Sequence, residues 1–242
     1  MPTALNGLLP DTEIISIDEK TGIQALSRKN PTLKMQKGKA QRIESEYKRN
    51  GTTSLMAAYD VIKGMLLYHW INPTRKEPDF LYFIQQVCAK IPIGKKLIFL
   101  LDQLNTHMSE SLVRWIAQQE AFQGDLGIKG QKGILKSMKS RKAFLEESTH
   151  RIRFVFTPKH CSWLNPVENW FSKLQRHVIK YGEFNSIDEL KIRMNAYVEF
   201  YNKCLAKPIK WKFKGFNKNT ILNGVKLRAL CIKFLGLLNC LR

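Results

Sequence analysis

A continuous apolar run, KLIFLL, occupies residues 96–101 and stops at Asp102. Every position after Lys96 is apolar, so both faces of a strand here would be buried, as in the centre of a sheet covered by helices on both sides. Helical spacing of apolar residues precedes the run at 77–91 and follows it at 109–119. The run therefore favours an α/β layer architecture.

Alternation and turn residues predict the remaining elements. In chain order these are a short strand over 12–18, a basic loop over 19–45, a hairpin over 51–71, a strand over 151–156, a helix capped by Asn165 with Pro166 in its first turn, and a helix capped by Ser186. Three β-rich runs thus precede the first helix, and strands and helices then alternate. This order predicts a mixed sheet flanked by helices.

The charge balance indicates a polyanionic partner. Forty Lys and Arg against twenty Asp and Glu give a net charge of +20, which attracts phosphate backbones and releases their counterions. Nucleic acid fits better than an anionic membrane surface, and no apolar run reaches the ~18 residues that span a bilayer. Five widely spaced cysteines without a C-x-x-C motif argue against a disulfide framework and for a reducing compartment.

Three acids stand at the ends of predicted elements. Asp18 closes the first strand, Asp102 closes the apolar run, and Glu168 begins a helix. Rigid elements hold side chains at such positions in place while leaving them open to solvent. Carboxylate oxygens are hard ligands of the kind that Mg²⁺ or Mn²⁺ binds. Two such ions can activate the attacking oxygen and stabilise the leaving oxygen of a phosphodiester. Each acid also has an ordinary alternative: Asp18 as a turn residue, Asp102 as a cap, and Glu168 as an acid favoured by the helix dipole.

Five stretches of the chain carry a family resemblance: SIDEKTGIQAL, EYKRNGTTSLMAAYDV, LIFLLDQLNTH, RIRFVFTPKHCSWLNPVENWFSKLQR and AYVEFYNKCLAKPIKWKF. Together, from about Ile14 to Gly215, they resemble the catalytic domain of bacterial insertion-sequence transposases related to the mariner group. That group belongs to the DDE endonuclease superfamily and has a ribonuclease H-like fold. The resemblance implies that Asp18, Asp102 and Glu168 are catalytic and hold two Mg²⁺ or Mn²⁺ ions. It also implies metal-dependent cleavage and strand transfer at insertion-sequence ends.

The same resemblance implies double-stranded DNA as the partner, both as element ends and as target, with a homodimer on DNA in the bacterial cytoplasm at the nucleoid. Candidate DNA contacts are Arg28, Lys48, Arg49, His107, Lys159, His160, Trp163 and Asn165. Orienting a ligand, contacting phosphate and local hydrogen bonding remain open for His107. Stacking on a base and packing beneath a helix remain open for Trp163. His160 and Cys161 lack a second ligand pair, so zinc is not expected.

Three features depart from the family pattern. The 65 residues of 103–167 form a longer spacing than the family usually shows, and the Gly- and Lys-rich stretch 124–149 accounts for the surplus as a basic insertion with a helix in its second half. Only seventeen residues precede Asp18, so we expect the helix-turn-helix that reads element ends to come from a separate partner. Residues 216–242 form a basic, apolar tail that resembles nothing in the family, which leaves 1–215 as the catalytic domain.

Three alternatives to the transposase remain. The chain can be an inactive remnant, a non-catalytic DNA-binding protein, or a related metal-dependent nuclease without strand transfer. The presence of all three acids argues against the non-catalytic DNA-binding protein, and the S-W-L-N motif at 162–165 argues against the nuclease without strand transfer. The inactive remnant stays open.

Overall fold

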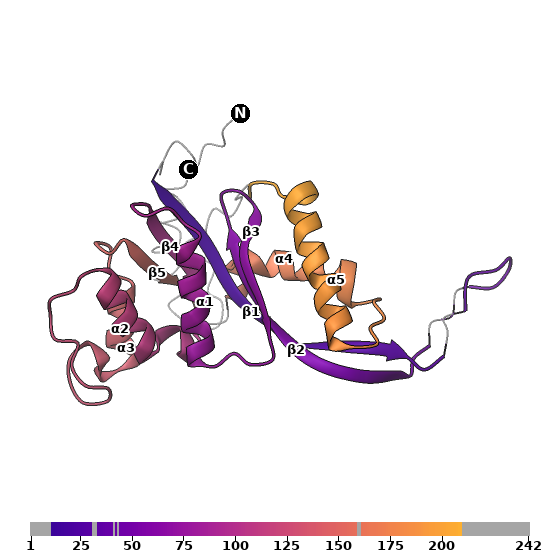
Figure 1. Ribbon diagram of the computed structural model, residues 1–242, viewed down its shortest axis with the longest axis horizontal. Coiled ribbons are helices and arrows are strands. Elements are labelled where there is room, and N and C mark those ends of the chain that lie inside the picture. The colour runs from indigo at the N-terminus through magenta and orange to yellow at the C-terminus, as the bar shows by residue number, and fades with distance from the viewer. Residues whose placement is uncertain (1–10, 31–32, 41, 43, 159–160, 210–242) are drawn as a thin grey trace, which may run out of the picture.

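A mixed five-stranded sheet forms the centre of the computed structural model, which describes residues 11–30, 33–40, 42, 44–158 and 161–209 (Figure 1). The strands are β1 (Thr12–Arg28), β2 (Tyr47–Asp60), β3 (Met65–Asn72), β4 (Lys96–Leu101) and β5 (Ile152–Phe156). Their order across the sheet is β3-β2-β1-β4-β5. β1, β2 and β3 pair antiparallel, whereas β4 and β5 join β1 in parallel. The predicted mixed sheet is confirmed.

Helices cover both faces of the sheet, as the apolar run at β4 predicts (Figure 1). One face carries α1 (Glu77–Ala89), α2 (Glu110–Gln119) and α3 (Met138–Leu145), and the other carries α4 (Val167–Leu174) and α5 (Ile187–Phe200). Alternation along the strands decides the face: Ile14 and Leu100 pack with α4 and α5, and Ile15 and Phe99 pack with α1 and α2. Two separate cores result, one on each side of the sheet.

β1 is longer than the sequence predicts. It continues past Asp18 to Arg28 and pairs with β2 as far as Tyr47, so the predicted loop over 19–45 is wrong in its first part. Gly22, with φ +66°, lies within the register shift between Lys20 and Ile23, a bulge that interrupts the alternation. Beyond the sheet the two strands continue as a ribbon (Figure 1). The second half of β1 pairs with residues that come about twenty or more positions later in the chain. The Gly, Pro and basic residues of 19–45 indicated a loop because they report only on the local sequence.

The insertion at 124–149 is a folded part of the core. Its second half contains the predicted helix, α3, preceded by a 3-10 turn, η2 (Ile134–Lys136). Leu135 and Leu145 are fully buried against the α1 and α2 side of the sheet, which the sequence did not predict. Arg141 donates from Nε to the Met108 carbonyl at 2.7 Å and from Nη1 to the Leu135 carbonyl at 3.1 Å. This guanidinium ties the insertion to the segment that follows Asp102.

Replacing Arg141 with Ala is expected to lower the free energy of unfolding by about 2 kcal/mol, because hydrogen bonds from a charged donor contribute ~1.5–3 kcal/mol. Lys139→Ala removes an exposed cation from the same helix and should change stability by less than about 0.5 kcal/mol. Urea denaturation of both variants measures the difference. Equal stability of the two variants would show that the insertion is held without this side chain.

The predicted tail at 216–242 lies outside the described residues, as do residues 1–10. Among the helices of the described part of the chain, none combines the length and the apolar character needed to cross a membrane.

Candidate active site

Asp18 and Asp102 lie side by side on neighbouring strands. Ser16 of β1 pairs with Leu100 of β4 in parallel register. Asp18 lies two residues further along β1, and Asp102 directly follows the last residue of β4. By alternation, both side chains then point to the face that carries α4. Glu168 is in the first turn of that helix. The fold therefore brings the three predicted acids to one face of the sheet.

The pKa of Asp18 reports the proximity of the other two acids. Burial raises this pKa, and the charges of Glu168 and Asp102 raise it further, against the opposing hydrogen bond from the Glu19 backbone and the charge of His107. The resulting pKa is about 6. Three carboxylates that repel one another form a donor set that a divalent cation would stabilise.

The described residues contain no group of three or more His, Cys, Asp and Glu side chains that is already spaced as a metal cage. Magnesium sites commonly use only one or two carboxylates and complete the shell with waters and substrate phosphates. An all-protein cage is therefore not required for these acids to hold an ion, because waters or substrate phosphates can fill the remaining positions.

Asn165 joins β1 to the start of α4. Its side chain is buried, donates from Nδ2 to the Ile17 carbonyl at 2.8 Å and to Asp18 Oδ2 at 3.2 Å, and accepts from the Ser16 hydroxyl. The Ser16 hydroxyl in turn accepts from the Val167 backbone N–H at 2.9 Å. The first N–H of α4 is thus capped from β1, and the predicted side-chain cap by Asn165 is wrong. Instead, Asn165 fixes Asp18 relative to the helix that carries Glu168.

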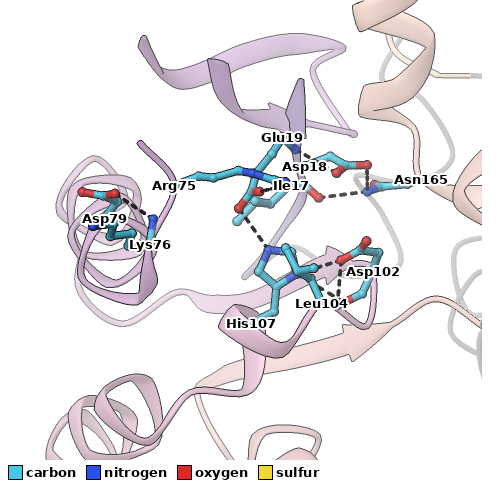
Figure 2. A network of polar contacts seen from close by, with 10 residues as sticks. All are labelled: Ile17, Asp18, Glu19, Arg75, Lys76, Asp79, Asp102, Leu104, His107 and Asn165. Atoms are coloured by element: carbon cyan, nitrogen blue, oxygen red, sulfur yellow. Dashed lines mark hydrogen bonds and ion pairs between the residues drawn. The ribbon is translucent and has the colours of Figure 1, made fainter. Parts of the chain in front are cut away.

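His107 lies in a 3-10 turn, η1 (Asn105–Met108), beneath Asp102 (Figure 2). Its Nδ1 is 2.9 Å from Asp102 Oδ1, and its Nε2 is 3.4 Å from Glu19 Oε1. Burial alone would lower the pKa of His107, but the contacts with these two carboxylates outweigh it and raise the pKa to about 9. Because His107 is only 1% exposed, it cannot contact a DNA phosphate in this structure. Its position fits the alternative in which it orients a ligand.

The Asp102 carboxylate is held through one of its two oxygens. Burial would raise the pKa of Asp102, but the hydrogen bond and charge of His107 and the backbone N–H of Leu104 lower it below the usual value. Leu104 donates to Oδ1 at 3.0 Å, the same oxygen that faces His107. Both of these contacts fall on Oδ1 and neither involves Oδ2.

Sequence reasoning missed Glu19 and Arg75. The Glu19 side chain is 3% exposed, and its Oε2 is 3.2 Å from Arg75 Nη1 (Figure 2). Glu19 follows Asp18 on β1, so it faces the opposite side of the sheet. Strand alternation was the signal that could have found it, but using that signal required knowing that β1 continues past Asp18.

Three of the predicted DNA contacts are exposed. Lys48 and Arg49 are exposed at the start of β2, where the Arg49 guanidinium is 5.8 Å from the centre of the Tyr47 ring. Trp163 is 54% exposed in η3 (Ser162–Leu164), the turn before α4. This exposure favours the stacking alternative for Trp163 over packing beneath the helix.

The remaining candidates are placed differently. Arg28 makes an ion pair with Glu183 at 3.1 Å and donates to the Glu44 carbonyl at 2.6 Å, so its guanidinium already has protein partners. Asn165 is buried and cannot reach DNA in this structure. Lys159 and His160 lie outside the described residues.

Comparisons with solved structures find Mos1 transposase. Its catalytic domain with raltegravir and Mg is 12% identical, with 78% of this chain and 75% of that chain covered and a TM-score of 0.45. The Mos1 strand transfer complex is 13% identical, and the match covers 81% of this chain and 50% of that chain with a TM-score of 0.47. A Mos1 mariner paired end complex with Mn is 15% identical, and the match covers 79% of this chain and 54% of that chain with a TM-score of 0.34. The match thus spans about half of the chain in each of these two complexes.

No curated protein matches the chain. A family model described as DDE superfamily endonuclease matches residues 13–191. That range includes Asp18, Asp102 and Glu168 and extends over β1 to β5, whose order and directions fit the ribonuclease H-like sheet implied by the resemblance. Because the match spans most of the sequence and the whole sheet, this chain belongs to the DDE superfamily endonuclease family.

Proposed function

We propose that this chain is the catalytic domain of a DNA transposase, which cuts DNA at the ends of an insertion sequence and joins the cut end to target DNA. The observation that supports it is the grouping of Asp18, Asp102 and Glu168 on one face of the sheet, close enough for their charges to raise the pKa of Asp18. The family match supports the endonuclease step.

Asp18, Asp102 and Glu168 would hold two Mg²⁺ or Mn²⁺ ions. Bound ions of this kind activate an attacking oxygen and stabilise the leaving oxygen of a phosphodiester. The chain's own contribution is orientation: Asn165 holds one oxygen of Asp18, and His107 and Leu104 hold one oxygen of Asp102. In each case the carboxylate is fixed before metal or DNA arrives.

The reaction has two phosphoryl-transfer steps. In the first, the oxygen of water attacks a phosphorus atom, the 3′ oxygen leaves and takes a proton, and the products are a 3′ hydroxyl and a 5′ phosphate. In the second, the 3′ hydroxyl loses its proton as its oxygen attacks a target phosphodiester, whose own 3′ oxygen leaves. Each step replaces one P–O bond with another, so the second needs no external energy source.

Duplex DNA is the proposed substrate and target. The net charge of +20 supplies a sequence-independent attraction for phosphates, and Lys48, Arg49 and Trp163 offer exposed side chains for backbone and base contacts. A homodimer on DNA and a site of action at the bacterial nucleoid are the further expectations that the family resemblance carries.

Incubation of the purified chain with duplex DNA carrying a labelled 3′ end and a target plasmid tests this function. We expect Mg²⁺ to produce nicks and EDTA to abolish them, and we expect the label to become joined to the plasmid. Nicking without joining would favour the nuclease alternative. Binding without nicking, at any Mg²⁺ or Mn²⁺ concentration, would favour the non-catalytic alternatives and contradict the proposal.

A further inference from the structure

A polar network with a buried centre lies beneath Asp102. It consists of Arg75, Glu19 and His107 and ends at the Asp102 carboxylate (Figure 2). The side chains of Glu19 and His107 are 3% and 1% exposed. Neither can reach solvent, a DNA phosphate or an ion beside Asp18, so neither acts on the substrate directly.

The imidazole of His107 is held in one orientation. Both of its nitrogens lie beside carboxylate oxygens, which only accept hydrogen bonds when ionised, so both nitrogens act as donors. The ring also packs against the Phe80 ring, with the ring centres 4.3 Å apart. Rotation of the imidazole would break its contact with Asp102, with Glu19 or with both.

Glu19 is fixed at both of its carboxylate oxygens. Oε1 faces His107 Nε2 at 3.4 Å and Oε2 faces Arg75 Nη1 at 3.2 Å. The backbone of Glu19 is held in β1, where it pairs with Met56 of β2. Through Glu19, the position of His107 is therefore fixed relative to β1, the central strand of the sheet, which also carries Asp18.

We propose that Glu19 and His107 are positioning residues that set the orientation of the Asp102 carboxylate, with Oδ1 held by His107 and Leu104 and Oδ2 presented to a divalent cation. This inference rests on the proposed function of Asp102 as a metal ligand. Partners that orient a ligating side chain typically account for a 10–100-fold difference in metal affinity. Because Glu19 and Asp18 are adjacent on β1, one strand would fix the direct ligand Asp18 and, through His107, the second ligand Asp102.

A purely structural role makes a different prediction. A buried ion pair contributes little net stability relative to apolar side chains of similar volume, and a role confined to stability would leave metal affinity unchanged in any variant that folds. Metal affinity, measured apart from cleavage, therefore separates the two roles.

The test measures the dissociation constant for Mn²⁺, added alone, from the electron paramagnetic resonance signal of the free ion, and thermal melting of each variant in parallel. We expect Glu19→Leu and His107→Ala each to weaken Mn²⁺ binding by about tenfold or more. Glu19→Gln keeps an oxygen that accepts from His107 Nε2, so we expect it to restore affinity to within about threefold of the wild type. The Mg²⁺ concentration for half-maximal nicking should rise strongly in Glu19→Leu and His107→Ala and only slightly in Glu19→Gln.

Glu13→Leu is the matched control. Glu13 is a second nearly buried carboxylate on the same face of β1. It lies near the start of the strand, paired with Lys95 at 2.6 Å and Lys63 at 3.3 Å. Its replacement should affect melting as much as Glu19→Leu does, with Mn²⁺ affinity unchanged.

Two outcomes distinguish this inference from the function on which it rests. If Asp102→Asn loses Mn²⁺ binding while folded Glu19→Leu or His107→Ala binds as the wild type does, the positioning role is wrong and the proposed site stands. If Asp102→Asn itself binds Mn²⁺ normally, the proposed metal site is wrong. Should Glu19→Leu not fold, His107→Ala decides alone, because it breaks the network at a different residue.

Discussion

Replacing Asp102 with Asn is expected to lower Mg²⁺-dependent nicking of duplex DNA by about 10³-fold or more, since an ion at such a site contributes several kcal/mol to the transition state and each 1.36 kcal/mol is tenfold in rate. Asn keeps the shape of the side chain but not the charge that holds the ion. DNA binding should persist, because phosphate contacts elsewhere supply the affinity. Single-turnover nicking and a gel-shift titration measure the two effects.

Asp125→Asn is the matched control for this variant. It makes the same change in net charge at a side chain that is 79% exposed in the insertion. Its nicking rate should equal that of the wild type within about twofold, as is usual for surface substitutions. Full activity of purified Asp102→Asn would refute the assignment of Asp102 as a metal ligand.

The second large effect is expected at Asn165. Replacing it with Ala should lower the free energy of unfolding by about 3 kcal/mol, because the Ile17 carbonyl and the Ser16 hydroxyl would both lose buried hydrogen-bond partners. Nicking should fall as well, since Asp18 and the start of α4 would lose their common anchor. Urea denaturation measures the first effect and the nicking assay measures the second.

Two further variants sharpen this prediction. Asn195→Ala removes an exposed amide of α5 that contacts His69 of β3 at 2.8 Å, and it should cost less than about 0.5 kcal/mol. Asn165→Asp has nearly the same shape as the wild type but cannot donate to the Ile17 carbonyl when ionised, and it places a charge beside Asp18. An Asn165→Asp protein as stable as the wild type would show that the donated hydrogen bonds do not hold β1 to α4.

The sheet was predictable because its strands are encoded locally. The apolar run at 96–101 could be buried only between two helical layers, and the turn residues at 60–64 indicated the hairpin between β2 and β3. The helical spacing at 77–91 and the Ser109 cap likewise matched α1 and α2, and the Ser109 hydroxyl accepts from Leu112 as a cap should. These signals depend on neighbouring residues, so no long-range information was needed.

The contacts made across long sequence distances were not predictable. Residues 19–28 form a strand only because they pair with β2, and the Gly, Pro and basic residues of the whole stretch 19–45 had indicated a loop. Asn165 appeared as a helix cap, but its hydrogen bonds go to β1, almost 150 residues earlier in the chain. The burial of Leu135 and Leu145 likewise depends on where α3 packs.

The sequence by itself determined which chemistry is available: three acids in order, a basic surface, and the motifs that match the DDE endonuclease family. Only the tertiary structure decided how those acids are held. The parallel pairing of β1 with β4 places Asp18 beside Asp102, and the alternation of β1 turns Glu19 toward His107 on the opposite face. Residue types are fixed by the sequence, but a carboxylate's orientation depends on partners that folding brings together from distant parts of the chain.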